Sequence, residues 1–396
     1  MAMAVLDLEF ERLPPSITGL EHFDSALVLI RLRGRPVGQA LLPVVRGRVG
    51  GDTELRDALM YTADSAFWEQ WLRNYLGWKE EKVTNSKLPA ATVAICTRNR
   101  HEDLRCCLDA LMRMPDDGQE LLVIDNCPSS DATRRLVKGY GRVRYICEDI
   151  PGLDIARNRA LREAQHEIIA FTDDDAAPDP CWLRALLRNF DHPLVLCVTG
   201  LTMPIELETE AQEYFQRLGG LGRGFKRTVF DSARYNPFEG WQAGAGVNMA
   251  LRRSVLTCVG SFDEGLDVGT PVRGGGDTDI LRRILAAGYY IVYDPESLNW
   301  HRHRHTWKDL RRQLYGYESA GFAVWTRSLL VERNPDAMKQ AWDWLWRELP
   351  ALGRSLLRLP GSTPCDLILA RFLGAAIGPW AYLYSRWILR KRKKQP

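Results

Sequence analysis

The sequence predicts an α/β fold in which helices flank a mostly parallel sheet. From Pro89 onwards, short apolar runs rich in β-branched residues alternate with segments whose apolar residues recur every three or four positions. Strands that alternate with helices at this spacing form crossover units, which place the strands parallel to one another. Polar residues follow directly after the predicted strands, at the edge where such sheets bind their ligands.

The elements of this domain are expected in a regular order. The helix at 103–112 illustrates the signal, because Leu104, Cys107, Leu108 and Leu111 lie on one face. Strands are predicted at 91–96, 120–124, 143–147, 167–172 and 194–199, and helices at 103–112, 131–138, 153–165, 180–190 and 280–287.

The residues that follow these strands are polar. They are Thr97, Arg98, Asn99 and Arg100 after the first, Asp125 and Asn126 after the second, Glu148 after the third, and Asp173, Asp174 and Asp175 after the fourth. The first strand is not followed by GxGxxG, and GxxxxGK[ST] does not occur, so the usual dinucleotide and P-loop sites are disfavoured.

The triplet Asp173, Asp174 and Asp175 comes at the end of an apolar strand. Adjacent carboxylates on a rigid strand end repel one another, so a divalent cation bound there would stabilise the arrangement. The alternative is a solvated acidic loop.

Charge and cysteine usage limit the function classes. A net charge of +3 argues against a nucleic-acid-binding protein, although residues 347–396 alone carry a net charge of +8. Nine cysteines without a CxxC pair indicate neither a disulfide framework nor a zinc site. Acidic residues in the N-terminal stretch MAMAVLDLEFERLP disfavour a signal peptide, so we predict a cytoplasmic location.

Five motifs resemble those of one enzyme family. TVAICTRNR, ELLVIDNCPSSD, GLDIARNRAL, FTDDD and GGGDTDILRRILAAGYYIVYDP, read in this order over roughly residues 90–305, are similar to the family 2 glycosyltransferases of GT-A fold. The resemblance implies transfer of a sugar from a nucleotide-diphosphate donor to an acceptor hydroxyl, with inversion and usually with Mn²⁺ or Mg²⁺.

Pattern and composition, together with the resemblance for the central part, divide the chain. Residues 1–88 would form a small strand and helix unit that ends in a linker at 79–88. Residues 89–305 would be the GT-A domain, with a nucleotide-binding half at 89–200 and an acceptor half at 201–305. Residues 306–396 would be helical, and the glycine-rich stretch at 219–239 is expected to be a mobile flap.

On the donor side, the resemblance makes Asp173 and Asp175 the DXD pair, with Asp175 on the metal and Asp173 towards either the ribose or a metal-bound water. Asp174 would either contact the nucleotide sugar or serve as a structural hydrogen-bonding group. Asp125 would pair with the base, although capping of the following segment is the alternative. Thr97, Arg98 and Asn99 would border the nucleoside.

Arg157 and Asn158 match the family's Ala-Arg-Asn helix start, where a cation could reach the nucleotide. The arginine could instead belong to a solvated helix face. Trp241 would stack on a sugar ring or belong to the core. Gly275 and Gly276 would let the backbone approach the sugar closely.

Asp277 is the candidate general base, because inverting transfer needs a carboxylate near the acceptor hydroxyl. Asp279 is the second candidate, and N-capping of the helix at 280–287 is its alternative role. Many family members have Glu where this chain has Gly276, which leaves the choice between the two aspartates open.

His301, His303 and His305 alternate in WHRHRHTW, so an extended chain would point all three the same way. By resemblance, His301 would complete the metal site.

The C-terminal region is predicted to associate with a membrane. The uncharged run 372–385 has fourteen residues, too few to span a bilayer. Its Trp and Tyr residues and the terminal RKRKK favour a segment that lies in the plane of an anionic surface. The alternative is a helical hairpin packed on the α/β domain, with a solvated tail.

The sequence therefore predicts a metal-dependent inverting glycosyltransferase at the inner face of the cell membrane, which would act on a glycan or lipid-linked acceptor of the cell surface. A nucleotidyl- or phosphoryl-transferase and a non-catalytic sugar-nucleotide-binding protein are the competing hypotheses. The sequence does not predict the sugar, the base or the oligomeric state.

Overall fold

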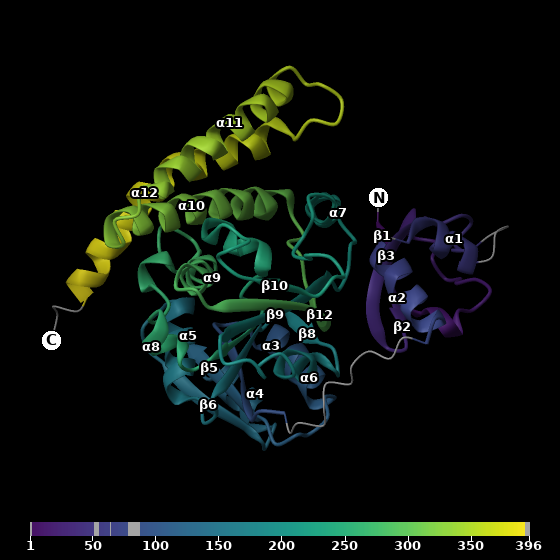
Figure 1. Cartoon of the computed structure of the whole chain (residues 1–396), viewed down its shortest axis with the longest axis horizontal. Coiled ribbons are helices and arrows are strands. Elements are labelled where there is room, and N and C mark those ends of the chain that lie inside the picture. Colours follow the sequence, from purple (N-terminus) through teal and green to yellow (C-terminus); the bar gives the residue numbers. More distant parts are fainter. Residues whose placement is uncertain (1, 51–54, 64, 78–87, 393–396) are drawn as a thin grey trace.

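The computed structural model describes residues 2–50, 55–63, 65–77 and 88–392. Nearly all of the linker predicted at 79–88 lies outside these ranges. Figure 1 presents the three parts of the described chain: a small N-terminal unit, a central α/β body and a layer of long C-terminal helices.

The central sheet confirms the predicted α/β fold class. Its strand order is β10 (Thr228–Phe230), β12 (Tyr290–His301), β9 (Val195–Pro204), β11 (Asn248–Arg252), β7 (Ile168–Asp173), β4 (Ala91–Thr97), β5 (Glu120–Asn126) and β6 (Val143–Glu148), and β8 (Ala176–Pro178) pairs with β12. Strands β4, β5, β6 and β7 pair in parallel, as do β9 and β12. β11 lies antiparallel between β7 and β9, so it joins these two parallel groups.

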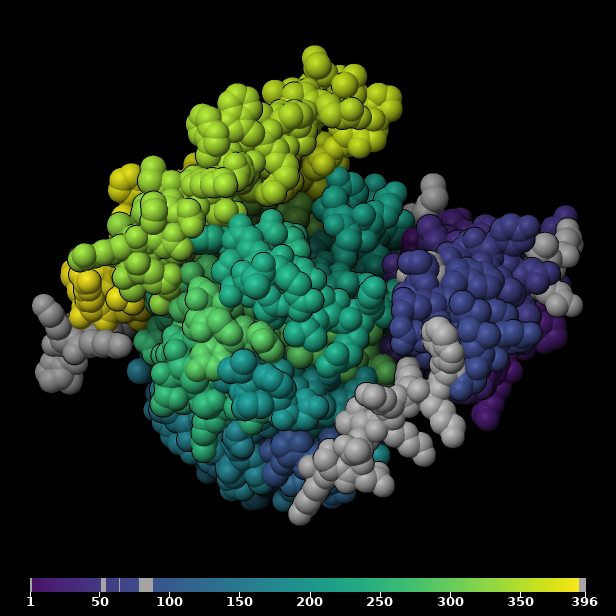
Figure 2. All heavy atoms as spheres, in the orientation of Figure 1, coloured from purple at the N-terminus to yellow at the C-terminus, as the bar shows by residue number. Residues whose placement is uncertain are grey.

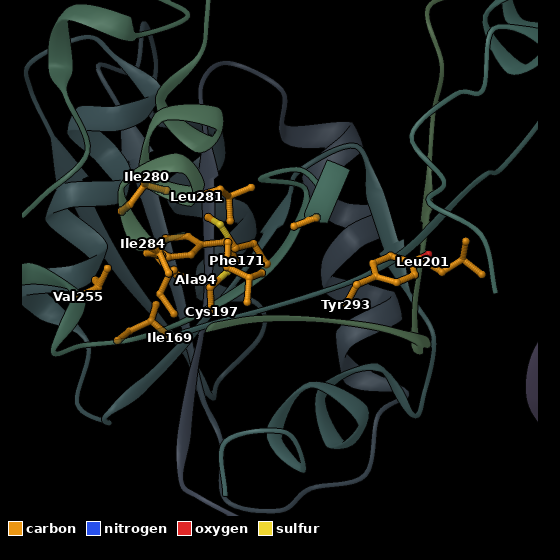
Figure 3. Close-up of a cluster of buried hydrophobic side chains, with 14 of the residues drawn as sticks. Ala94, Ile169, Phe171, Cys197, Leu201, Val255, Ile280, Leu281, Ile284 and Tyr293 are labelled. Carbon is orange, nitrogen blue, oxygen red and sulfur yellow. The ribbon is translucent and has the colours of Figure 1, made fainter. Parts of the chain in front are cut away.

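Each face of this sheet has its own core. Strand residues alternate in direction, so Ile169 and Phe171 lie in one core whereas Ile168 and Ala170 lie in the other. The first core includes α5 (Leu153–Glu163), α8 (Val255–Cys258) and α9 (Gly276–Ala286); Figure 3 shows Ile280, Leu281 and Ile284 of α9 gathered around Phe171. The second core includes α3 (His101–Met112), α4 (Ala132–Lys138) and α6 (Trp182–Leu187).

Two segments of this domain differ from the sequence predictions. α9 begins at Gly276 instead of Ile280, because Gly275 adopts a left-handed conformation (φ 108°) that starts the helix earlier. The stretch 219–239, predicted to be irregular, contains β10, which pairs with β12, and it leads into the 3₁₀ helix η2 (Pro237–Ala243).

The N-terminal unit packs against the central body. Its three-stranded sheet has the order β1 (Met3–Glu9), β2 (Ser25–Leu32) and β3 (Arg35–Pro43), with the 3₁₀ turn η1 (Phe10–Arg12) and with α1 (Leu55–Thr62) and α2 (Ser65–Tyr75). The amide of Met3 donates to the carbonyl of Leu207 at 2.8 Å, and Arg31 forms an ion pair with Asp179 at 2.7 Å.

Three helices, α10 (Trp307–Val331), α11 (Asp336–Leu356) and α12 (Cys365–Arg392), follow the sheet domain, and α7 (Glu210–Arg217) packs against α10. α12 has 28 residues, so the apolar segment is longer than the run 372–385 suggested. Within the described residues, Cys365–Lys391 is the one helix long and apolar enough to cross a membrane by length and composition, but 44% of its apolar window is buried inside the protein.

Candidate active site

The sheet brings the predicted site residues to one edge. Thr97 on β4 lies opposite Asp125 on β5, and Cys96 lies opposite Asp173 on β7. The carboxyl ends of these strands are therefore level, as the parallel arrangement requires.

The three aspartates after β7 have different surroundings. Asp173 is about one third exposed, whereas Asp174 and Asp175 are buried. Asp174 accepts a hydrogen bond from Thr97 Oγ1 at 2.8 Å and one from Arg100 at 2.6 Å. Its two oxygens are thus bonded to the end of β4 and to the loop that follows, which is a structural contact and one of the two roles considered for this residue.

Asp175 also binds Arg100, through Oδ2 at 2.7 Å, and its Oδ1 lies 3.2 Å from His301 Nε2. Burial alone would raise the pKa of Asp175, but His301 and Arg100 outweigh it and hold this pKa below its ordinary range. Burial raises the pKa of Asp174 to about 7, although Arg100 opposes the shift. Of the two buried carboxylates, Asp175 is therefore the one whose pKa its partners hold below the ordinary range.

Asp173, Asp175 and His301 form a group that could hold a metal ion, since their ligand atoms lie within 4.8 Å of one another. The buried Nδ1 of His301 has no hydrogen-bond partner among the described residues. Carboxylate oxygens and an imidazole nitrogen suit Mn²⁺, and the oxygens suit Mg²⁺. The side chains present therefore fit the metal that the resemblance implied.

The other two histidines have different partners. His303 lies against the Phe215 ring and 3.3 Å from Gln216 Oε1, and burial, reinforced by His301 and Arg304, lowers its pKa to about 3. His305 lies 2.9 Å from Glu206. His301 is thus the member of the alternating set that joins the carboxylates.

Asp125 lies fully buried at the end of β5. Tyr145 donates to its Oδ2 at 2.9 Å, while Oδ1 has no partner among the described side chains and backbone groups. Burial raises the pKa of Asp125, and the Tyr145 hydrogen bond opposes that rise. A buried carboxylate oxygen without a donor is costly, so this position suits a ligand N–H group.

The loop after β4 borders Asp125. Arg98 and Asn99 are exposed, and the side-chain oxygen of Asn99 accepts hydrogen bonds from the amide and hydroxyl of Ser129 at 2.8 and 2.9 Å. These bonds join the loops after β4 and β5.

Arg157 on α5 is a buried cation surrounded by carboxylates, not part of a solvated face. Its guanidinium lies 3.3 Å from Asp154 and 3.9 Å from Asp173. Burial would lower its pKa, but Asp154, Asp173 and Asp277 raise it above the ordinary value. The neighbouring Asn158 uses both amide atoms on the backbone of Phe262, at 3.0 and 2.9 Å, which ties α5 to that segment.

The two candidate bases are clearly distinguished by their contacts. Asp277 is partly exposed, and its oxygens accept from the amides of Gly246 and Thr278 at 2.9 and 2.8 Å. Asp279 is fully buried and forms ion pairs with Arg283 at 2.7 Å and Arg327 at 3.2 Å. Asp279 lies inside α9 and does not cap it, because Gly275 is the N-cap.

Trp241 lies in η2 and is 48% exposed, so it is not a core residue. The guanidinium of Arg223 lies 5.6 Å from its ring centroid, and Arg223 Nε donates to the Trp241 carbonyl at 3.3 Å. An exposed indole face held in this way is available to stack on a sugar.

Sequence reasoning missed two residues of the site. Arg100 binds Asp174 and Asp175. The sequence feature that could have identified it is its position in the TRNR run at the end of β4. Asp154 on α5 is buried, and its carboxylate fills the space that a Cβ atom on Gly276 would need. The glycine at position 276 is therefore required by the packing of Asp154, a pairing that no local pattern reveals.

The fold and this edge define an α/β sheet domain with a candidate site for a metal ion and a polar ligand. Comparisons with known proteins bear on its class. Residues 92–260 match the model of Glycosyl transferase family 2. This match covers the part of the chain that holds the first four of the five motifs, and it confirms the resemblance there.

Two curated relatives are similar to this chain. The pre-mycofactocin glycosyltransferase of Mycobacterium tuberculosis is 29% identical over 255 residues, which are 62% of this chain and 48% of that protein. The chain thus spans about half the length of that relative. The succinoglycan biosynthesis protein ExoM of Rhizobium meliloti is 23% identical over 63% of this chain and 78% of its own length.

Among solved structures, the mannosyltransferase PcManGT from Pyrobaculum calidifontis, in complex with GDP-Man and Mn²⁺, aligns with 83% of this chain and 95% of its own. Its sequence identity is 18% and its TM-score 0.48.

Proposed function

We propose that this protein is a metal-dependent inverting glycosyltransferase that moves a sugar from a nucleotide-diphosphate sugar to a hydroxyl group. The observation that carries the proposal is the group of Asp173, Asp175 and His301, with Arg157 between it and Asp277. Asp277 and Asp173 both act electrostatically on Arg157. A cation site and a separate carboxylate on one sheet edge are what this transfer requires.

The donor would lie along the ends of β4, β5 and β7. Asp125 would accept a hydrogen bond from the base, and the exposed Arg98 and Asn99 would border the nucleoside. Asp173, Asp175 and His301 would hold Mn²⁺ or Mg²⁺, which when bound supplies positive charge to the leaving diphosphate. Arg157 would add a fixed cation beside it, and because it is buried it needs no reorganisation.

The acceptor would lie on the side of Asp277 and Trp241. The oxygen of the acceptor hydroxyl would attack the anomeric carbon from the face opposite the diphosphate. Asp277 would take the proton of that hydroxyl during the attack. The bond between that carbon and the diphosphate oxygen breaks, the nucleoside diphosphate leaves, and the configuration inverts. The two amides that bind Asp277 would hold its carboxylate in place.

We assign Asp154 as a positioning residue in this reaction. It contacts Arg157 at 3.3 Å and fills the space beside Gly276, directly before the candidate base. It would fix the guanidinium between the donor carboxylates and Asp277.

For the acceptor, we propose a glycan or lipid-linked saccharide of the cell surface, used at the inner face of the cell membrane. The name of the succinoglycan biosynthesis relative supports a saccharide acceptor. The long apolar helix α12 is compatible with a membrane location.

The test is donor hydrolysis by the full chain with Mn²⁺ and a panel of nucleotide sugars. Release of a nucleoside diphosphate that stops when EDTA is added is the expected result. Release of pyrophosphate or a nucleoside monophosphate would instead indicate a nucleotidyl- or phosphoryl-transferase. Donor binding without any hydrolysis, with every acceptor class tried, would indicate a non-catalytic sugar-nucleotide-binding protein.

A further inference from the structure

Helix α12 packs on α10 through two glycines. A Cβ atom on Gly374 would collide with the backbone carbonyl of Tyr315, and one on Gly378 with the carbonyl of Ser319. Small residues four apart let two helix backbones approach closely. This contact determines which face of α12 is turned inward, and therefore which face is left outside.

The outward face of α12 is apolar along its length. The large exposed residues recur every three or four positions and are Leu369, Leu373, Ile377, Trp380, Leu383, Tyr384 and Trp387; Trp380 is 71% exposed. The two charged residues of this stretch are paired with protein groups. Arg371 binds Glu318 and Glu348, and Arg386 lies 3.4 Å from Asp263.

Helix α11 has a similar exposed face. Its buried Trp344 packs against Phe322 and Phe372, at centroid distances of 5.0 and 5.1 Å. The opposite side of the helix exposes Met338, Trp342, Trp346, Leu349 and Leu356. In Figure 2 the C-terminal helices stand out from the body of the molecule, so these faces are not covered by the sheet domain. We call the two sets of exposed residues together the apolar face of α11 and α12.

Positive charge lies at the end of this face. Arg390 and Lys391 are exposed, and the ammonium of Lys391 lies 3.8 Å from the centroid of the Trp387 ring. The sequence continues with Arg392, Lys393 and Lys394. Exposed tryptophans beside a basic cluster are the combination that in-plane helices use on anionic lipid surfaces.

We propose that the apolar face of α11 and α12 docks in the plane of an anionic lipid bilayer, with Trp380 and Trp387 in the interface and the basic end against the headgroups. α12 would lie on the membrane and not cross it, because its glycine side is packed on α10 and 44% of its apolar window is buried.

Docking in this orientation would place the acceptor side of the site near the bilayer, an inference that rests on the proposed function. α10 lies between α12 and the loop before α9, since Ala320 and Val324 of α10 are the neighbours of Gly275. The candidate base Asp277 is two residues further on. The acceptor side of the site would therefore be one helix away from the bilayer, within reach of an acceptor that is attached to a lipid.

The test is cosedimentation of the full chain with vesicles of phosphatidylcholine alone and with vesicles that also contain phosphatidylglycerol. Binding to the anionic vesicles, weakened by added salt, is expected. Trp380→Ser combined with Trp387→Ser should lower the bound-to-free ratio roughly tenfold or more, because two interfacial aromatic contacts are lost. Arg390→Gln combined with Lys391→Gln should lower it roughly 30-fold at low salt.

Trp68→Ser, at an exposed tryptophan of the N-terminal unit, is the matched control and should bind as the unmodified chain does. Unchanged vesicle binding by both double variants would overturn the proposal, and so would the absence of binding by the unmodified chain. A concentration-dependent oligomer that the tryptophan variant abolishes, without vesicle binding, would assign the face to a second copy of the chain.

Donor hydrolysis without lipid should be the same in all these variants. This readout separates the two proposals, since absence of hydrolysis by an unmodified chain that still binds the anionic vesicles would count against the proposed function alone.

Discussion

The proposed donor side and the proposed acceptor side of the site are built differently. On the donor side, Asp174 and Asp175 are buried and paired with Arg100, and the buried Arg157 lies among carboxylates. On the acceptor side, Asp277 is partly exposed and held by backbone amides, while Trp241 is half exposed. The donor side is therefore charged and preorganised, and the acceptor side is open.

The difference has a physical consequence for what each side would recognise. Buried ion pairs are strongly coupled, so loss of one partner leaves an uncompensated charge. An open carboxylate held by amides can be changed at little structural cost. Substitutions on the acceptor side should therefore affect turnover, and those on the donor side should affect binding or stability.

The largest effect is expected for Asp277→Asn. Loss of the general base should lower kcat by about 10²–10⁴-fold and leave donor affinity unchanged. Steady-state kinetics and donor titration would measure the two quantities, with Asp116→Asn on an exposed loop as control.

If turnover survives in Asp277→Asn but Asp279→Asn abolishes it without unfolding the protein, the base is Asp279. We expect Asp279→Asn to destabilise the fold by about 3–5 kcal/mol, since it breaks buried ion pairs.

The next effect is expected for Asp175→Asn, which removes one hard ligand and one charge. Mutation of a residue that only supports a metal ligand typically lowers metal affinity by roughly 10–100-fold. Affinity for Mn²⁺ in the presence of nucleoside diphosphate should fall by at least this factor, because Asp175 is itself a proposed ligand. Calorimetric titration with Mn²⁺ would measure this, and Asp191→Asn at an exposed position is the control. Metal affinity equal to that of the unmodified protein would remove Asp175 from the site.

A smaller effect, on stability, is expected for Gly276→Ala. The added methyl group collides with the Asp154 carboxylate, and overpacking of this kind costs about 1–3 kcal/mol. Thermal unfolding would measure it, with Gly321→Ala as control because nothing lies within 4 Å of that Cβ position. Asp154→Ala should relieve the collision, so the double variant should be less destabilised than the sum of the single variants. Strict additivity would contradict the proposed contact.

The smallest effect is expected for Tyr145→Phe, which removes the hydrogen bond to Asp125. That bond stabilises the ionised carboxylate, so its loss should raise the already raised pKa of Asp125 further. Nucleotide affinity should fall roughly fivefold, about 1 kcal/mol, and the pH below which binding weakens should move upward. Nucleotide titration over a pH series would test this. Tyr140→Phe, which removes a similar bond to Asp109, should have no effect.

Much of this site follows from local pattern. Asp125 and the triplet Asp173, Asp174 and Asp175 were found because they follow apolar runs, and the ends of parallel strands meet at one edge. Their roles required the family resemblance. His301 required the family resemblance as well. Their long-range contacts were not visible in this way. Arg100 pairs with Asp174 and Asp175 from 74 and 75 positions away, and Asp154 packs against Gly276 from 122 positions away.

The apolar segment at the C-terminus illustrates the same limit. The sequence contains the tryptophans and the basic tail, but the uncharged run 372–385 is shorter than the helix, which continues through Arg371 and Arg386 because both are paired with carboxylates of the protein. Only the tertiary structure shows which face of α12 is buried against the rest of the protein.

By itself, the sequence determined the α/β class, the strand ends and the identity of the carboxylates at the sheet edge, because periodicity and strand termini are local properties of the chain. The tertiary structure decided the start of α9, the separation of Asp277 from Asp279, the pairing of Asp154 with Gly276, and the exposed face of α12. Each of these depends on which distant groups share a buried volume, and that is a property of the folded chain alone.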